Sequence, residues 1–140
     1  MGESLARAQS AGMPSALPTE VFIADDSASI RVRLTQLLAA LEYVVVVGEA
    51  ASAAEAISGI LRQRPHLVLL DLKLAGSTGI EVMRTVAPLA PDIAFVVLTN
   101  HFEPQYRDAC LEAGARFFLD KSRDLDRVAG VIAQCMEKTQ

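Results

Sequence analysis

The chain has 140 residues, of which 51% are apolar and 21% are charged, and its formal net charge is −4. This length suits one domain with a buried core and is too short for two such domains. Its 13 lysines and arginines form no basic face, which argues against direct nucleic-acid binding, and its apolar runs are far shorter than the about 20 residues of a membrane helix.

No basic segment leads into an apolar one at the N-terminus, so we expect a cytoplasmic protein without membrane contact. Residues 1–18 are instead rich in Ala, Ser, Gly and Pro and show no period. Pro14 and Pro18 would interrupt any helix there. We therefore predict a mobile tail over residues 1–18 and one folded domain over residues 19–140.

Short apolar runs alternate with amphipathic segments from Val21 onward. The runs are rich in β-branched or aromatic residues and nearly continuous in hydrophobicity, which is typical of strands buried on both faces. The five predicted strands are residues 21–25, 43–50, 66–71, 93–99 and 115–120.

A helical segment follows each predicted strand. The five predicted helices are residues 27–41, 52–64, 79–89, 103–114 and 123–138. Ser27 and Ser52 are suited to cap helix N-termini, Pro104 after Glu103 marks another helix start, and Gly114 marks a helix end. The chain thus contains five strand–helix repeats.

Alternating strands and helices predict an α/β fold, because each parallel connection needs a right-handed crossover that covers a face of the sheet. A closed barrel would need more strands than this chain has. We therefore expect an open, parallel, five-stranded sheet in a three-layer sandwich, of the flavodoxin-like (βα)5 type with strand order 2-1-3-4-5. In this order the first and third strands are neighbours, and ligands bind beyond their carboxyl ends.

Carboxylates stand at the ends of these two neighbouring strands. Asp25 and Asp26 end the first strand, and Asp71 ends the third, so three acidic side chains should meet at one edge of the sheet. Such a set of oxygen ligands suits Mg²⁺, which binds a few carboxylates and keeps water and phosphate oxygens in its octahedron. The sequence therefore predicts a magnesium site that can receive phosphate.

Two further polar residues follow the remaining strands. Thr99 ends the fourth strand and Lys121 follows the fifth, so every strand end except the second contributes a polar group. Each residue alone has an ordinary structural explanation, because an aspartate before a helix is usually an N-cap and a lysine after a strand is usually solvated. Their joint spacing is what favours a common site.

Other chemistries find less support in the sequence. Cys110 and Cys135 are far apart and form no C-x-x-C motif, so we expect reduced thiols. Haloacid-dehalogenase-type phosphatases need D-x-D after the first strand. In this chain Asp25 is followed by Asp26 and Ser27, so the second aspartate of that motif is replaced by Ser27. Neither of the glycine-rich phosphate-binding motifs of nucleotide-binding domains occurs.

Residues 20–140 resemble the receiver domain of two-component response regulators. The resemblance matches the family's acidic pair, phosphoacceptor, hydroxyl and lysine to Asp25, Asp26, Asp71, Thr99 and Lys121. It also matches Phe118 to the family's switch aromatic and Gly79 to the glycine that closes the loop after the third strand.

The resemblance implies a phosphorylation mechanism. A sensor histidine kinase or a phosphotransfer protein would give a phosphoryl group to Asp71, and the domain would catalyse its own phosphorylation and dephosphorylation without turning over a separate substrate. Mg²⁺ would bind Asp26, Asp71 and the backbone carbonyl of Lys73, with Asp25 acting largely through water. Lys121 and Thr99 would bind the new phosphoryl oxygens.

The resemblance also implies a conformational output. Thr99 would move inward and Phe118 would fill the vacated space, which would repack the surface around the fourth helix, the fifth strand and the fifth helix. Lys73 and His101, two positions after Asp71 and Thr99, would tune the lifetime of the phosphoryl group. The output partner stays open between a homodimer, another protein and a downstream DNA-binding domain, as does the choice between a single-domain regulator and part of a longer protein.

Three positions depart from the family pattern. Ala75 and Ser122 stand where the family usually or often has Pro, and Asn100 stands where it commonly has a small residue. We expect a looser loop at Ala75, no basis for a cis peptide at Ser122, and a bulkier side chain beside the phosphate pocket at Asn100. A degenerate receiver that binds partners without phosphorylation is therefore the alternative function.

Overall fold

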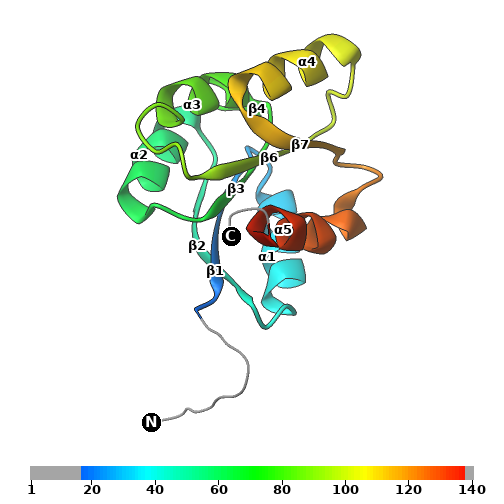
Figure 1. The fold of residues 1–140 in the computed structure, drawn as a ribbon. Helices are drawn as coiled ribbons and strands as arrows, with labels where there is room; N and C mark the ends of the chain where they lie inside the picture. Colours follow the sequence, from blue (N-terminus) through cyan, green and yellow to red (C-terminus); the bar gives the residue numbers. More distant parts are fainter. Residues whose placement is uncertain (1–16, 138–140) are drawn as a thin grey trace.

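The computed structural model describes residues 17–137, and the predicted mobile tail lies outside the described residues except for its last two positions. A parallel five-stranded sheet with strand order β2-β1-β3-β6-β7 forms the centre of the fold (Figure 1). Its strands are β1 (Thr19–Ala24), β2 (Val44–Ala50), β3 (Leu67–Leu70), β6 (Ala94–Thr99) and β7 (Ala115–Asp120). Counted along the chain, this order is the predicted 2-1-3-4-5, so the flavodoxin-like topology is confirmed.

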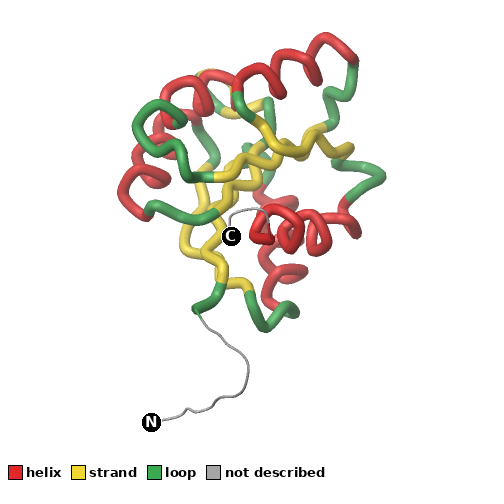
Figure 2. The backbone as a smooth tube through the Cα atoms, viewed as in Figure 1, coloured by secondary structure: helices red, strands yellow, loops and turns green. Residues whose placement is uncertain are grey.

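Helices cover both faces of this sheet and complete the three layers (Figure 2). They are α1 (Ala28–Ala39), α2 (Ala53–Gln63), α3 (Gly79–Val86), α4 (Pro104–Ala113) and α5 (Val128–Glu137). Helices α1 and α5 lie on one face, and α2, α3 and α4 lie on the other (Figure 1). Each face has its own cluster of buried apolar side chains.

The continuous hydrophobicity of the central strands follows from these two clusters. Successive side chains of a strand point to opposite faces. In β1, Val21 and Ile23 accordingly pack under α1 and α5, whereas Phe22 and Ala24 pack on the side of α2 and α3. The stretch of β1 that serves both clusters, residues 21–24, is accordingly apolar at every position.

The expectation of burial on both faces is wrong for the edge strand β2. Val45 of this strand is 41% exposed, whereas every residue of the central strand β3 is buried. Within the sheet β2 pairs only with β1, so its outer side has no neighbouring strand to cover it.

The predicted helix signals are mostly confirmed. The hydroxyls of Ser27 and Ser52 accept hydrogen bonds from backbone N–H groups of the first turns of α1 and α2, at 3.3 and 3.1 Å. Gly114 ends α4 with φ of 116°, a left-handed conformation that glycine adopts without a Cβ clash.

The predicted start of the last helix, at residue 123, is wrong. After β7 the chain forms turns, in which Ser122 N–H and Asp120 N–H donate to the carboxylates of Asp120 and Asp124, both at 2.9 Å. A short 3-10 helix, η1 (Leu125–Arg127), follows, and α5 begins at Val128. Side-chain bonds to the backbone compete with helix formation here.

A second small sheet was not predicted. The strands β4 (Lys73–Leu74) and β5 (Ser77–Thr78) pair antiparallel around Gly76, whose φ is 87°. Two residues per strand are too few to show a period in the sequence. The hairpin lies in the loop that directly follows Asp71.

Cys110 and Cys135 are buried in the two different clusters, on opposite faces of the sheet, and both are thiols as predicted. Burial raises the pKa of the Cys110 thiol to about 11, so it stays protonated at neutral pH. Within residues 17–137 no helix is long and apolar enough to cross a membrane.

Candidate functional site

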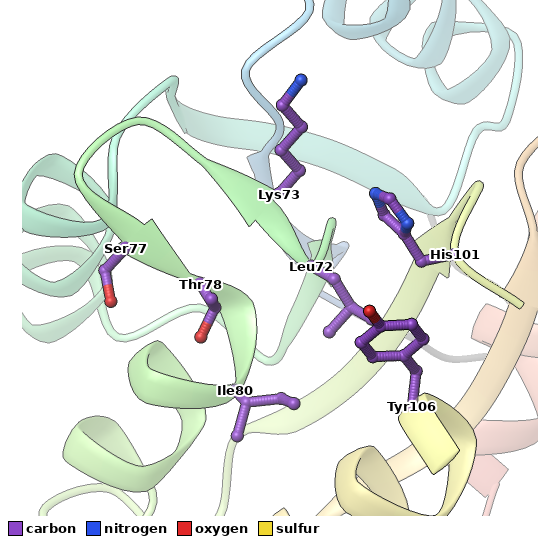
Figure 3. A pocket seen from close by; sticks show the side chains of 7 residues that line it. All are labelled: Leu72, Lys73, Ser77, Thr78, Ile80, His101 and Tyr106. Carbon is purple, nitrogen blue, oxygen red and sulfur yellow. The ribbon is translucent and has the colours of Figure 1, made fainter. Parts of the chain in front are cut away.

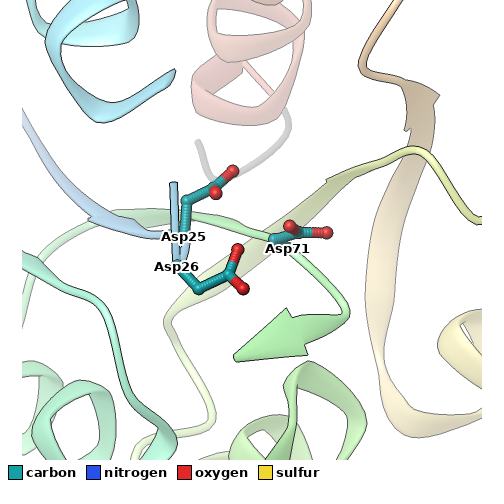
Figure 4. A group of neighbouring side chains, drawn as sticks. All are labelled: Asp25, Asp26 and Asp71. Carbon is teal, nitrogen blue, oxygen red and sulfur yellow. The ribbon is translucent and has the colours of Figure 1, made fainter. Parts of the chain in front are cut away.

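The three predicted carboxylates meet at one edge of the sheet. Asp25 and Asp26 directly follow β1, and Asp71 directly follows the neighbouring strand β3. One carboxylate oxygen from each lies within 4.8 Å of the others (Figure 4). Asp25 and Asp71 are buried, with 2% and 4% exposed, whereas Asp26 is open to solvent.

Lys121 joins the two buried carboxylates. Its Nζ lies 2.8 Å from Asp25 Oδ2 and 2.8 Å from Asp71 Oδ2. The lysine directly follows β7, and its backbone N–H donates to the carbonyl of Thr99 at 2.9 Å. One ammonium thus links the ends of β1, β3 and β7 and is itself buried.

The charges of this group are strongly coupled. Burial raises the pKa of Asp25 above its ordinary value by more than the hydrogen bond from Lys121 lowers it. For Lys121, burial acts to lower the pKa, but the hydrogen bonds to Asp25 and Asp71, together with the negative charges of these carboxylates, outweigh it and the pKa is raised. The lysine therefore stays charged at neutral pH.

The oxygens of the three carboxylates differ in their partners. Asp25 uses both, since Oδ2 binds Lys121 and Oδ1 accepts from Ser27 N–H at 2.8 Å. Asp71 Oδ1 is buried and has no hydrogen-bond partner among the described residues. A buried carboxylate oxygen without a donor is costly, so a cation beside Asp71 and the exposed Asp26 would relieve that cost. The donor set fits a hard metal ion.

The two predicted switch residues lie on neighbouring strands. Thr99 ends β6 and is fully buried, and its hydroxyl accepts a hydrogen bond from His101 N–H at 3.2 Å. Phe118 on β7 is partly buried and stacks on Phe102, with ring centroids 5.0 Å apart. Phe102 lies in the loop between β6 and α4, so this stack joins that loop to β7.

A cavity of about 230 Å³ lies between the β4–β5 hairpin, which follows Asp71 in the chain, and the start of α4 (Figure 3). The structure brings the two predicted lifetime-tuning residues, Lys73 and His101, together in its lining. His101 also packs against Tyr106, with ring centroids 5.7 Å apart. The other residues that line the cavity are Leu72, Ser77, Thr78, Ile80 and Tyr106.

The three departures from the family pattern have clear local settings. Ala75 N–H donates to the carbonyl of Ala51 at 3.1 Å, and the carbonyl of Ala75 accepts from Ala53 N–H at 3.0 Å. Ala75 thus supplies a donor that proline lacks, and the expected loosening of this loop stays a prediction. Ser122 donates through its hydroxyl to Asp120 at 2.7 Å and follows a trans peptide, and Asn100 is exposed.

Gly79 is required by its close approach to the phosphoacceptor loop. Its N–H donates to the carbonyl of Leu72 at 2.9 Å, and a Cβ at this position would collide with the carbonyl oxygen of Asp71. We expect Gly79→Ala to lower the free energy of unfolding by about 1–3 kcal/mol, since the backbone at Asp71 must shift.

Urea denaturation would measure this loss. Gly130→Ala is the matched control, because Gly130 lies in α5 and a Cβ there meets open space. That change should leave stability unaltered or raise it by up to about 1 kcal/mol. Equal effects of the two substitutions would contradict the steric role of Gly79.

Two residues near the site were missed in the sequence. Arg31 of α1 donates through Nη1 to the backbone carbonyl of Asp25 at 2.6 Å, and its Nε lies 3.0 Å from Glu49 Oε1. Glu49 belongs to β2, the one strand for which no polar contribution was expected. The only signals in the sequence are their positions. Arg31 lies in the first turns of the helix that follows the acidic pair, and Glu49 lies near the end of a strand.

Comparisons with known proteins agree with this geometry. The model of the response regulator receiver domain family matches residues 21–133. Response regulator GacA of Pseudomonas protegens is 32% identical over 112 residues, which cover 80% of this chain and 53% of GacA. The DNA-binding transcriptional activator DevR/DosR of Mycobacterium tuberculosis is 34% identical over 102 residues, which cover 73% of this chain and 47% of that protein.

A solved structure agrees as well. The signal receiver domain of the response regulator NarL from Mycobacterium tuberculosis has a TM-score of 0.82 and 26% identity, with 87% of this chain and 98% of that chain covered. The chain spans about half the length of the curated relatives it matches. On the family match, the relatives and the fold, this chain belongs to the receiver domains of two-component response regulators.

Proposed function

We propose that this receiver domain accepts a phosphoryl group on Asp71 from a phosphohistidine of a sensor kinase or a phosphotransfer protein. The observation that carries the proposal is the state of the Asp71 carboxylate. It is buried beside two other carboxylates, one oxygen is bound by Lys121, and the other has no hydrogen-bond partner among the described residues. Such a carboxylate is held in place and still has an oxygen available for reaction.

The chemistry is nucleophilic substitution at phosphorus. A carboxylate oxygen of Asp71 would form a bond to phosphorus while the phosphorus–nitrogen bond of the phosphohistidine breaks. The departing imidazole nitrogen keeps the electron pair of that bond, and because the other ring nitrogen carries a proton, the kinase or phosphotransfer histidine leaves as neutral imidazole. The product on this chain is an acyl phosphate.

Mg²⁺ is the proposed cofactor, held by Asp26, Asp71 and the backbone carbonyl of Lys73. When bound, it neutralises negative charge on the transferring group. Asp25 would act largely through water, which agrees with its two oxygens being bound by Lys121 and Ser27. Asp26 suits direct binding, because it is exposed and none of the described residues forms a hydrogen bond or ion pair with its side chain.

Lys121 and Thr99 would receive the new phosphoryl oxygens. Turning the Thr99 hydroxyl toward the phosphoryl group would release its hydrogen bond from His101 N–H. Phe118 would then move into the vacated space and leave its stack on Phe102. The surface formed by α4, β7 and α5 would change as a result. Lys73 and His101, in the lining of the neighbouring cavity, would set how readily water reaches the acyl phosphate.

The remaining partners are proposed from the relatives. The name of DevR/DosR describes a DNA-binding transcriptional activator, and only about half of that protein is matched here. We propose that the switched surface acts on a DNA-binding segment, on another protein or on a second copy of the domain, in the cytoplasm.

Phosphoryl uptake from acetyl phosphate tests the proposed function. Intact-mass spectrometry should show the addition of one phosphoryl group when the protein is incubated with acetyl phosphate and millimolar MgCl₂, and little addition in EDTA. No uptake with MgCl₂ would favour a receiver that binds partners without phosphorylation. Equal uptake in EDTA would contradict the metal requirement.

A further inference from the structure

The acidic pair is held very unevenly. Asp25 is bound through both carboxylate oxygens, and its backbone N–H donates to the carbonyl of Ala50 at 3.0 Å. Asp26 has no comparable side-chain partner within residues 17–137, although it contributes an oxygen to the three-carboxylate cluster. The direction of the Asp26 side chain therefore depends on the backbone that carries it.

Arg31 holds this backbone. Its Nη1 donates to the carbonyl oxygen of Asp25 at 2.6 Å. That carbonyl belongs to the peptide unit that joins Asp25 to Asp26, and a peptide unit is planar. Fixing the carbonyl oxygen therefore fixes the orientation of the Asp26 N–H. It also fixes the direction of the bond from this nitrogen to the Cα of Asp26.

Glu49 holds Arg31 from the other side. The Glu49 carboxylate on β2 lies 3.0 Å from Arg31 Nε, while Nη1 reaches the acidic loop. A guanidinium carries its donors in a rigid plane, so two contacts at different nitrogens fix its orientation. The side chain of Arg31 is 19% exposed, which leaves it little room to rotate away. The second strand thus reaches the site indirectly, through an arginine of α1.

We propose that Arg31 is a positioning residue for the metal site, which aims the Asp26 carboxylate at the cation by holding the Asp25–Asp26 peptide unit. This inference rests on the proposed function, because it assumes that Asp26 binds Mg²⁺. Two simpler roles are available to an arginine here. It can form a partly exposed ion pair with Glu49, which contributes little to the stability of the fold. It can also act on Mg²⁺ binding only through its positive charge.

These roles predict different results. A positive charge near three carboxylates repels Mg²⁺, so removing a cation that acts only by charge strengthens Mg²⁺ binding. Removing an ion pair that only stabilises the fold leaves Mg²⁺ binding by the folded protein unchanged. Removing a positioning residue weakens Mg²⁺ binding, and loss of a group that orients metal ligands typically weakens it by about 10–100-fold.

The test is calorimetric titration of the 140-residue chain with MgCl₂. Arg31→Ala should weaken Mg²⁺ binding about tenfold. The matched control is Arg33→Ala, since Arg33 is an exposed arginine of the same helix and has no ion pair among the described residues. This control should bind Mg²⁺ as the wild type does or slightly more tightly. Arg31→Gln replaces Arg31→Ala if the alanine variant does not fold.

A second measurement observes the peptide unit itself. In metal-free protein, the ¹⁵N and ¹H shifts of the Asp26 amide should change in the Arg31 variant and stay unchanged in the Arg33 variant. If the wild type binds Mg²⁺ and the Arg31 variant binds it equally or more tightly, the positioning role is refuted while the proposed function stands. If the wild type does not bind Mg²⁺, the proposed metal site fails and this inference fails with it.

Discussion

Asp71→Asn should abolish phosphoryl uptake while leaving the fold intact. The amide has nearly the shape of the carboxylate but lacks the anionic oxygen that attacks phosphorus, so uptake should fall by at least about a hundredfold. The fold should persist, because Lys121 keeps its second carboxylate partner, Asp25, at 2.8 Å. Intact-mass spectrometry after acetyl phosphate treatment measures uptake, and circular dichroism checks the fold.

The control for this substitution is Asp92→Asn. Asp92 is exposed and lies before β6, at the opposite end of that strand from Thr99. This variant should take up phosphoryl groups as the wild type does. Persistent uptake by the Asp71 variant, in a form that hydroxylamine does not remove, would show that the group is carried elsewhere and not as an acyl phosphate on Asp71.

Lys121→Met should have the largest effect on stability. The substitution leaves two buried carboxylates, those of Asp25 and Asp71, without their shared cation. Removing one partner from a buried ion pair typically costs about 3–5 kcal/mol, because the remaining charge stays buried and unpaired. Urea denaturation in EDTA should show this loss at neutral pH. Lys73→Met is the control, since Lys73 is exposed and has no ion pair among the described residues.

The loss in Lys121→Met should depend on pH. The pKa of Asp25 is already raised in the folded protein, so its contribution to stability is greatest below its ordinary value of 3.8 and falls as pH rises through the folded value. Removing the Lys121 hydrogen bond, which lowers this pKa, raises it further. The variant should therefore approach the wild type in stability as the pH falls from about 7 towards about 4. A deficit that stays constant over this range would contradict an electrostatic origin.

The topology and the carboxylate cluster were predictable from the sequence. They depend on which residues are apolar and on which residues stand at the ends of strands. Residues 21–24 of β1 serve two cores and are therefore apolar at every position, and this pattern is visible in the sequence. Parallel strands place their carboxyl ends at one edge, so Asp25 and Asp71 had to meet once β1 and β3 were neighbours. The caps at Ser27 and Ser52 depend only on neighbouring residues.

The features that were missed depend on contacts between distant or irregular segments. The β4–β5 hairpin is too short to show a period, and the delayed start of α5 results from side-chain bonds by Asp120 and Asp124. The hydrogen bonds that join Ala75 to the start of α2 are made by its backbone, so the type of residue at this position does not predict them. Likewise, the contact of Arg31 with Glu49 spans 18 residues and depends on how α1 lies against β2.

Locating the phosphoryl group within the chain tests the central claim most directly. Protein treated with acetyl phosphate and MgCl₂ can be reduced with borohydride, which converts an aspartyl phosphate to homoserine, and then digested and sequenced by tandem mass spectrometry. Our account predicts homoserine at position 71 and intact aspartate at positions 25 and 26. Conversion at Asp25 or Asp26, or a phosphoryl group on a serine or threonine with position 71 unchanged, would contradict Asp71 as the phosphoacceptor.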